Sequence, residues 1–182
     1  MKCVDLSKFS SKSYKAGGLM KRCGWYLISI LFFKTNLPYP YGLKRFLLRL
    51  FGANVGKRVF IKPNVNIKYP WFLEVGDNVW IGEGVWLDNL AEIKIKNNVC
   101  ISQGAYILTG NHNYKKETFD LILKPVLIEN GVWVGSKVVV CPGVTLNAHA
   151  VITAGGVISK DAEAYTIYKG NPAQAIRERK ID

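Results

Sequence analysis

Aliphatic and small side chains recur at every sixth position over most of the chain. A period of six fits neither an α-helix, which repeats every 3.6 residues, nor a continuous strand, which repeats every two. A second ladder lies two positions after the first, so each repeat supplies a pair of side chains that point to one side. The first ladder comprises Val55, Ile61, Ile67, Leu73, Val79, Val85, Ile93, Val99, Ala105, Val126, Val132, Val138, Val144, Ala150, Gly156 and Ala162. The second comprises Val75, Ile81, Leu87, Ile95, Ile101, Ile107, Ile128, Val134, Val140, Leu146, Ile152 and Ile158.

A short strand followed by a turn accounts for this period. Gly, Asn and Asp, as in Gly76-Asp77-Asn78 and Asn130-Gly131, are the residues that turns favour. Three such strands close a triangular coil of about eighteen residues, and stacked coils form a parallel β-helix. We therefore predict a mainly β protein with roughly five coils, stacked at a strand spacing of about 4.8 Å. A β-sandwich does not explain a shared register of six.

Two segments, 88–92 and 109–125, break the register. The second is about seventeen residues long and polar, and long excursions from a rigid scaffold are usually functional. It contains His112, one of two histidines in the protein. Imidazole titrates near neutral pH and is suited to remove a proton from an alcohol. His112 is therefore a candidate general base, against the alternative of a solvated loop residue; His149 falls at a predicted corner.

The segment before the repeats is helical and basic. Helices are expected over 18–33 and 42–51, separated by Leu37-Pro38-Tyr39-Pro40. We divide the chain into a basic N-terminal extension or cap (1–52), a β-helix (53–169) carrying the loop 109–125, and a closing segment or helix (170–182). Of the net charge of +12, residues 1–50 hold +9, from ten Lys and Arg against Asp5. Such an arm could cap the open first coil, bind an anionic membrane surface, or do both.

Several classes of protein are excluded by motif. The four cysteines form no C-x-x-C pair, and with two histidines they give no metal site. Zinc-finger, RRM and KH signatures are absent, so no nucleic acid partner is expected. The longest apolar run, Trp25 to Phe33, is nine residues, against about 20 needed to span a bilayer. We expect a cytoplasmic protein, with contact at the inner face of the cytoplasmic membrane if the arm binds lipid.

The repeats resemble those of the hexapeptide-repeat acyltransferases, over about residues 42–177. Motifs outside the repeat narrow the resemblance to the O-acetyltransferases of colanic acid and capsule synthesis, of the maltose and galactoside acetyltransferase type. These motifs are Arg45-Phe46-Leu47-Leu48-Arg49-Leu50-Phe51-Gly52-Ala53, Leu87-Asp88-Asn89-Leu90, Thr109-Gly110-Asn111-His112-Asn113-Tyr114 and Thr118-Phe119-Asp120-Leu121. The tail Gly170-Asn171-Pro172-Ala173, followed by Ile176-Arg177, resembles the end of the prism in the wider family.

The resemblance implies a left-handed coil, a homotrimer, a C-terminal helix and acetyl-CoA as co-substrate. It places the catalytic base at His112, with direct transfer and no acyl-enzyme, since the loop holds no cysteine. The coenzyme would lie along coil corners. The matching residues are Trp133, Gly135, Ser136, Ala154, Gly155, Ser159, Lys160 and Arg177. Two departures from the family pattern, Thr153-Ala154-Gly155-Gly156 and Asp161-Ala162-Glu163-Ala164, affect the expected local contacts.

The acceptor is expected to be a sugar hydroxyl in surface-polysaccharide assembly, on a free or a lipid-linked glycan. Asp88 and Asn89 in the shorter break could bind its hydroxyls; the alternatives for Asp88 are that it orients the imidazole or is a corner residue without a ligand. Trp86 could offer an aromatic face, against the alternative of a strand residue that is only packed or exposed. Three alternatives remain: N-acetylation of an amino sugar or serine-type acceptor, a hexapeptide-fold carbonic anhydrase, and a structural prism without activity. The anhydrase needs three zinc-binding histidines, and the chain has two.

Overall fold

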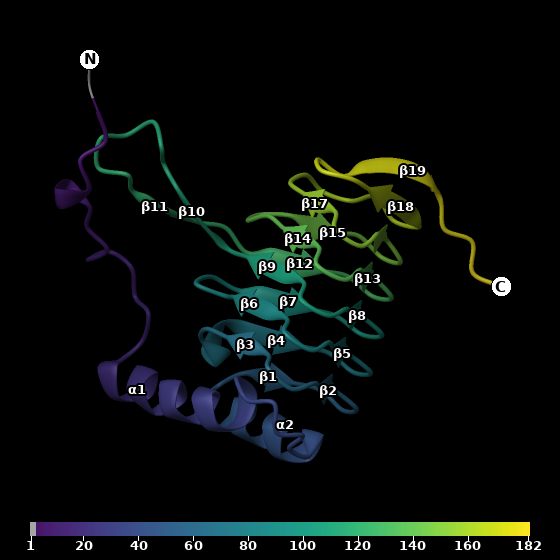
Figure 1. The fold of residues 1–182 in the computed structure, drawn as a ribbon, viewed down its shortest axis with the longest axis horizontal. Helices are drawn as coiled ribbons and strands as arrows, with labels where there is room; N and C mark the ends of the chain where they lie inside the picture. The colour runs from purple at the N-terminus through teal and green to yellow at the C-terminus, as the bar shows by residue number, and fades with distance from the viewer. Residues whose placement is uncertain (1–2) are drawn as a thin grey trace.

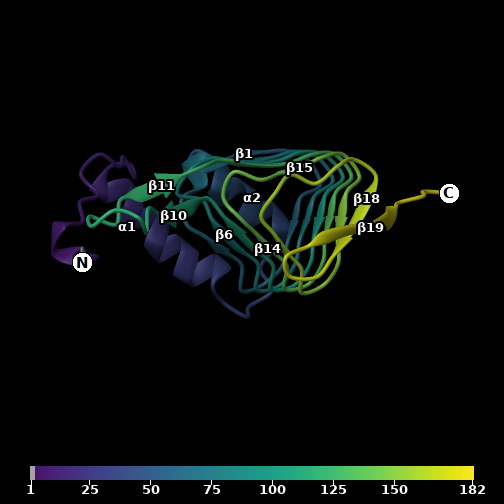
Figure 2. The ribbon, with the colours of Figure 1, turned by 90° about the horizontal axis from the view of Figure 1, so that it is seen from above.

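The computed structural model describes residues 3–182 and shows a three-sided prism of stacked parallel strands (Figure 1). Seen along its axis, the prism has a triangular outline (Figure 2). Face A contains β1 (Asn54–Val55), β4 (Leu73–Val75), β7 (Ile93–Ile95), β12 (Val126–Ile128) and β15 (Thr145–Leu146). Face B contains β2 (Phe60–Ile61), β5 (Trp80–Ile81), β8 (Cys100–Ile101), β13 (Trp133–Val134), β16 (Val151–Ile152) and β18 (Thr166–Lys169). Face C contains β3 (Asn66–Ile67), β6 (Trp86–Asp88), β9 (Tyr106–Leu108), β14 (Val139–Val140) and β17 (Val157–Ile158).

The predicted ladder residues form the core. Every one of them is buried, and Ile61, Ile81 and Ile101 stack above one another with no exposed surface. Faces A and C hold five parallel strands and face B holds six, against the roughly five coils expected. Because each coil is two to three residues wide on each face, the aliphatic pair of each repeat is enough to fill the triangle.

The corners are held by a ladder of short polar side chains. Asp77 Oδ1 accepts a hydrogen bond from the backbone N–H of Lys57, at 2.6 Å. Asn97 Oδ1 accepts from the N–H of Asp77 at 2.7 Å, and Asn130 Oδ1 accepts from the N–H of Asn97 at 2.9 Å. The side chain of each coil thus satisfies a backbone donor of the coil below, which explains why Asn and Asp recur at this edge.

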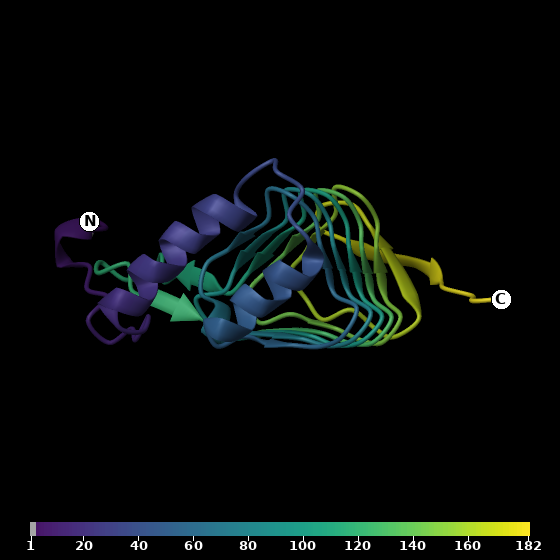
Figure 3. The same ribbon diagram turned by 90° about the horizontal axis from the view of Figure 1, so that it is seen from below.

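Two helical segments lie across the N-terminal end of the prism (Figure 3). The first consists of α1 (Leu19–Ile28) continued by a π turn, η2 (Ser29–Phe33), and the second is α2 (Tyr41–Leu50). These agree closely with the helices expected over 18–33 and 42–51. No helix within residues 3–182 is long and apolar enough to cross a membrane.

Basic residues of α2 pair with the free carbonyl groups of the first coil. The Lys44 ammonium is buried and donates to the carbonyl oxygens of Ile61 and Lys62, at 3.2 and 3.0 Å. Arg49 donates from Nε and Nη2 to the carbonyl of Val55, at 2.9 and 2.6 Å. Arg45 Nη1 and Trp25 Nε1 reach the carbonyls of Val59 and Ile67, at 3.1 and 2.8 Å. Part of the positive charge of the arm therefore serves to cap the prism.

The longer break in the register forms an antiparallel hairpin. Its strands are β10 (Gly110–His112) and β11 (Leu121–Leu123), and it projects beyond the prism beside the N-terminal segment (Figures 1 and 2). That segment contains a short 3₁₀ turn, η1 (Leu6–Lys8), and a second 3₁₀ turn, η3 (Pro70–Phe72), precedes β4.

The expected C-terminal helix is wrong. Residues after Gly170 turn back and form a strand, β19 (Gln174–Glu178), which pairs antiparallel with β18. Gly170 adopts φ +99°, a conformation open to glycine that allows the reversal. Strand formation gives the last strand of face B a hydrogen-bonded neighbour, and five residues of helix could not do so.

We expect the substitution Lys44→Met to lower the free energy of unfolding by about 1–3 kcal/mol. The new side chain has similar length but no donor, so the carbonyls of Ile61 and Lys62 lose their partner inside the protein. Chemical denaturation would measure the change. The matched control is Lys57→Met, at an exposed position, which should stay within about 0.5 kcal/mol. Equal stability of the two variants would show that the buried ammonium does not hold the cap.

Candidate active site

His112 ends β10 and its ring is oriented by the opposite side of the hairpin. The ring Nδ1 lies 2.8 Å from the backbone carbonyl oxygen of Phe119. A carbonyl can only accept, so Nδ1 carries the proton and donates it to this oxygen. In the neutral ring Nε2 is then unprotonated, and its lone pair is available to accept a proton.

Phe119 has an unusual backbone conformation that makes this contact. Its φ is +49°, in the left-handed region that a residue with a bulky side chain rarely adopts. Its ring stacks on the imidazole with centroids 4.4 Å apart and an interplanar angle of 7°. Phe119 thus fixes both the tautomer and the plane of His112, which are the properties a general base requires.

The N-terminal segment supports the hairpin from outside. The Phe9 ring lies 5.6 Å from the His112 ring, on a tilted plane. The Asp5 N–H donates to the carbonyl of Glu117 at 2.9 Å, and Lys8 forms an ion pair with the Glu117 carboxylate. The chain before α1 therefore packs against the hairpin and against the His112 ring.

The shorter break, 88–92, lies at the root of the hairpin. The Thr109 hydroxyl is buried, donates to the carbonyl of Asp88 at 2.8 Å and accepts from the N–H of Ala91 at 3.0 Å. Asp88 is 9% exposed, and its Oδ1 lies 3.2 Å from the Lys68 ammonium but takes part in no hydrogen bond among the described residues. Asp88 thus places an ion-paired carboxylate close to the root of the hairpin that carries His112.

Tyr14 lies close to this carboxylate. Its hydroxyl donates to the carbonyl of Leu90 at 2.7 Å. Burial raises the pKa of Tyr14 above its usual range, and the nearby Tyr69 and Asp88 act in the same direction. The hydroxyl therefore remains a neutral donor across the physiological range.

Asn89 does not face a ligand site, which corrects its expected role. Its side chain has no exposed surface, and Oδ1 accepts from the N–H groups of Lys68 and Tyr69 at 3.0 and 3.1 Å. Its Nδ2 donates to the carbonyl of Tyr69 at 2.6 Å. The amide is occupied in holding the coil below. Trp86, by contrast, is partly exposed on face C and stacks on Tyr106 with centroids 4.6 Å apart.

Five of the residues expected to bind the coenzyme gather on the edge between faces B and C. Trp133 is 48% exposed and its Nε1–H donates to the Ser102 hydroxyl at 2.9 Å. The N–H of Gly155 donates to the carbonyl of Ser136 at 2.8 Å, and Ala154 is exposed beside it. Gly135 is buried, and a Cβ there would lie 2.7 Å from the Ala154 nitrogen, so the stacking of coils itself requires glycine.

The other three residues lie elsewhere in the chain. Ser159 and Lys160 are exposed after β17, at the corner between faces C and A. Arg177 is exposed on β19, opposite Ile167. The hairpin and residues 88–92 also leave face C at its corner with face A. We call the C/A corner that carries His112 the histidine corner, and the B/C edge that carries Trp133 the Trp133 edge. Within one chain, these two lie on opposite sides of face C.

His149 is a corner residue, as expected. Its φ is +59°, and its ring stacks on Tyr165 with centroids 4.7 Å apart. Residues 3–182 contain no group of three or more His, Cys, Asp or Glu side chains that could hold a metal ion. Burial raises the pKa of the thiols of Cys100 and Cys141, so neither is an activated nucleophile.

Several residues around the histidine were not among the site residues expected from the sequence. Phe9, Tyr14 and Thr109 lie outside the hexad pattern, and the first two approach the site only because the chain folds back along the hairpin. Thr109 could in principle have been found from the sequence, because the hexad register breaks at this residue.

Proteins similar to this chain are acetyltransferases. It is 39% identical over 176 residues to WcaF of Escherichia coli (strain K12), which is named as an acetyltransferase of colanic acid biosynthesis; the match covers 96% of this chain and 97% of WcaF. It is 28% identical over 153 residues to the galactoside O-acetyltransferase of the same organism, covering 81% and 75% of the two chains. No protein-family model matches the chain.

Solved structures show the same fold. A hexapeptide-repeat-containing acetyltransferase from Vibrio cholerae superposes with a TM-score of 0.80 at 25% identity, over 97% of this chain and 98% of that one. The same protein complexed with acetyl coenzyme A gives 0.79 at 26% identity, covering 94% and 92%. A galactoside acetyltransferase in complex with coenzyme A gives 0.77 at 25%, covering 88% and 82%. These likenesses confirm the predicted left-handed parallel β-helix.

Proposed function

The chain belongs to the hexapeptide-repeat acetyltransferases, and from this premise we propose that it transfers acetyl from acetyl-CoA to a sugar hydroxyl in surface-polysaccharide synthesis. The relative WcaF, named for colanic acid biosynthesis, and the galactoside O-acetyltransferase support a sugar acceptor. The complexes of similar proteins with acetyl-CoA and coenzyme A support the donor. The observation that carries the proposal is the Nδ1–H contact of His112 with the Phe119 carbonyl, because it leaves Nε2 free to act as a base.

In the proposed reaction, His112 Nε2 takes the proton of the acceptor hydroxyl. The sugar oxygen attacks the thioester carbonyl carbon, and a backbone N–H stabilises the oxyanion that develops. The tetrahedral intermediate expels the coenzyme A thiolate, and this thiolate takes up the proton from the imidazolium. The Phe119 carbonyl keeps its hydrogen bond throughout and stabilises the charged ring.

The coenzyme would lie along the edge formed by Trp133, Gly135, Ser136, Ala154 and Gly155. This edge offers exposed backbone and an aromatic ring, and pantetheine is an extended chain of amides that suits such a surface. Arg177 would reach the nucleotide phosphates as a planar fork. Lys160, at the corner between faces C and A, would do so as a point charge from an adjacent chain. Asp88 and Trp86 would bind the acceptor, since the Asp88 carboxylate lies at the root of the hairpin and Trp86 is exposed on face C.

We propose that the active form is a homotrimer whose sites are shared between neighbours. In one chain, His112 and the Trp133 edge flank opposite sides of face C. The hairpin projects beyond the prism (Figure 2), so it can reach the Trp133 edge of an adjacent chain. Cyclic association completes every site in this way.

Sedimentation should give three times the chain mass of 20.4 kDa. As a sharper test, two inactive variants would be mixed: His112→Ala, which lacks the base, and Ala154→Trp, which fills the exposed coenzyme edge. Denaturation and refolding together should restore activity, because some neighbours then combine an intact histidine with an intact edge. A monomer with full activity, or no restoration on mixing, would contradict shared sites.

We also propose that the helical end contacts the inner face of the cytoplasmic membrane. α1 and η2 leave Met20, Leu27 and Leu31 exposed, and α2 leaves Phe46 and Leu50 exposed. These apolar side chains lie on a segment whose net charge is +9, a combination that favours anionic lipid surfaces. The two residues before Cys3 lie outside the described part of the chain.

Leu31→Glu should weaken binding to vesicles that contain anionic phosphatidylglycerol, because it places a carboxylate in the apolar surface. Cosedimentation would measure the bound fraction, which should fall with added salt for the unchanged protein. Ile181→Glu makes the same change at an exposed position near the C-terminus and should bind normally. Equal binding by both variants would show that the helices do not contact the membrane.

His112→Ala should reduce acetyl transfer by about 10²–10⁴-fold, the usual contribution of a positioned base. Acetyl-CoA affinity should change little, because the proposed coenzyme edge does not include the histidine.

The control for this experiment is His149→Asn, since asparagine tolerates the positive φ at that corner. It should retain near-normal turnover. If His112→Ala transfers acetyl as fast as wild type under conditions where chemistry limits the rate, His112 is not the base.

A further inference from the structure

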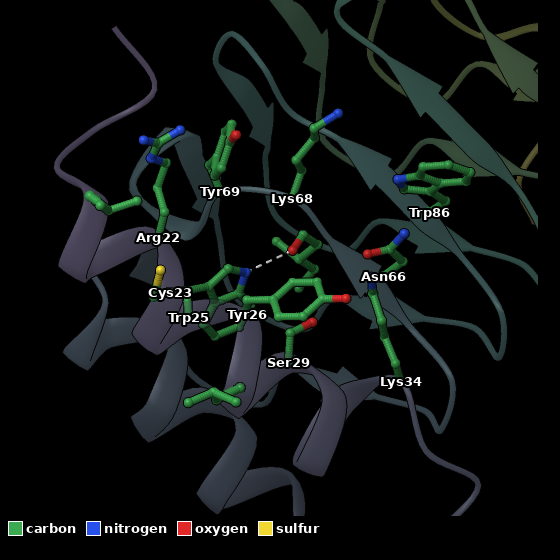
Figure 4. A pocket seen from close by; sticks show the side chains of 13 residues that line it. Arg22, Cys23, Trp25, Tyr26, Ser29, Lys34, Asn66, Lys68, Tyr69 and Trp86 are labelled. Carbon is green, nitrogen blue, oxygen red and sulfur yellow. Dashed lines mark hydrogen bonds between the residues drawn. The ribbon is translucent and has the colours of Figure 1, made fainter.

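A cavity of about 690 Å³ lies between α1 and the lower part of face C (Figure 4). Arg22, Tyr26 and Ser29 line it from the helical side, and Lys68, Tyr69 and Trp86 line it from the prism. Trp25 closes its base through the hydrogen bond from Nε1 to the Ile67 carbonyl. This hydrogen bond links α1 to β3, so the two walls of the cavity are held in place relative to each other.

The charged groups in this cavity are all positive. Arg22, Lys34 and Lys68 line it, and no Asp or Glu among residues 3–182 does. Lys68 pairs with Asp88, whereas Arg22 and Lys34 form no ion pair within residues 3–182. Two cations without counter-charges beside a concave surface favour an anionic ligand.

Buried polar atoms in the cavity also lack partners. The Ser29 hydroxyl belongs to a side chain that is 2% exposed, and it makes no hydrogen bond in the described chain. The buried Nε of Arg22 is likewise without a partner there. Buried polar groups of this kind are rare in proteins and are commonly satisfied by a ligand or water. A phosphate oxygen accepts from both donor types.

The cavity continues onto an apolar surface. Leu19 and Leu27 line it and are 66% and 61% exposed. They adjoin the exposed Ile30 and Leu31 along α1 and η2. Charge alone would suit a nucleotide sugar, but such a ligand would leave this apolar continuation unused. An isoprenoid or acyl tail would occupy it.

The opposite end of the cavity leads toward the proposed active site. Trp86 lines the cavity and starts the strand that ends at Asp88, and Tyr69 follows Lys68 at the same corner. Aromatic faces and a carboxylate are groups that bind sugars. The order along the surface is therefore apolar helix, cationic cavity, then aromatic and acidic groups next to the hairpin.

We propose that the acceptor is a glycan linked through phosphate or diphosphate to a lipid, and that this cavity holds the phosphate. The inference rests on the proposed function and adds the class of acceptor. Arg22 and Lys34 pair with the phosphate, the tail lies over Leu19 and Leu27, and the sugar lies against Trp86 and Asp88. The acetylated hydroxyl is then delivered from the membrane side of the protein.

Calorimetric titration of the full chain with farnesyl phosphate tests the cavity directly. We expect binding at least about tenfold tighter than for farnesol or inorganic phosphate, because each of these lacks one half of the recognised pair. The double variant Arg22→Gln/Lys34→Gln should lose about tenfold in affinity. Within residues 3–182 neither side chain makes a hydrogen bond or ion pair, so the variant should unfold at the wild-type temperature.

The control is Lys57→Gln/Lys180→Gln, which removes two exposed charges elsewhere and should bind as wild type does. Leu27→Gln should weaken farnesyl phosphate while leaving the affinity for inorganic phosphate unchanged. Equal affinity of the wild type and the Arg22/Lys34 variant would overturn the proposal. Tighter binding of UDP-glucose than of farnesyl phosphate would overturn it too, in favour of a nucleotide-linked acceptor.

An activity measurement separates this inference from the proposed function. The acceptors would be methyl glucoside and glucose linked to farnesyl diphosphate, with acetyl-CoA as donor. Higher kcat/KM for the lipid-linked sugar, lost in the Arg22/Lys34 variant alone, supports the cavity. Equal transfer to both acceptors overturns the cavity and leaves acetyl transfer standing. Transfer to neither acceptor counts against the proposed function, and the titration then decides whether the cavity binds lipid phosphate.

Discussion

A stacked β-helix must satisfy the backbone groups that its first coil leaves without a neighbouring strand. Between coils the hydrogen bonds run both ways: the Gly56 N–H donates to the Val75 carbonyl, and the Asn78 N–H donates to the Lys57 carbonyl. The first coil has no coil beneath it, so its downward-facing carbonyls need donors from elsewhere in the chain. Buried carbonyls without partners are costly, so the cap has to bring side-chain donors to this end of the prism. Lys44, Arg45 and Arg49 supply them from a single helix, and the position of α1, with the cavity beneath it, follows from that cap.

The same constraint explains how much of the fold could be predicted. A period of six fixes which side chains point inward, so the core, the faces and the two breaks could be located from the sequence. The C-terminal strand could not, because Gln174–Glu178 is too short for a periodicity and is decided by the free edge of β18. Asn89 was misassigned for a related reason: an amide in a polar break resembles a ligand group until its three backbone partners are known.

The candidate site shows a similar division. His112 could be identified because it is a titratable residue in the longest interruption of a regular scaffold. Its orientation could not, since it depends on the left-handed backbone at Phe119 and on contacts with Phe9. The corner residues Gly135 and Gly155 were found by resemblance to a family pattern, which cannot separate a coenzyme contact from a structural need for glycine. Gly135 is required by the close approach of stacked coils, and Gly155 by its φ of +72°.

The contacts between the N-terminal segment and the hairpin have a consequence for how the protein folds during synthesis. Lys8 and its partner Glu117 are 109 positions apart, so the segment before α1 leaves the ribosome long before its binding site exists. The helical cap and the first coils are local in sequence and can assemble while synthesis continues. The N-terminal segment must wait until the hairpin emerges, and only then does it enclose the histidine. The nascent chain therefore folds its scaffold first and completes the surroundings of His112 last. Extra residues fused to the N-terminus would thus interfere with the packing around His112 and leave the folding of the β-helix unaffected.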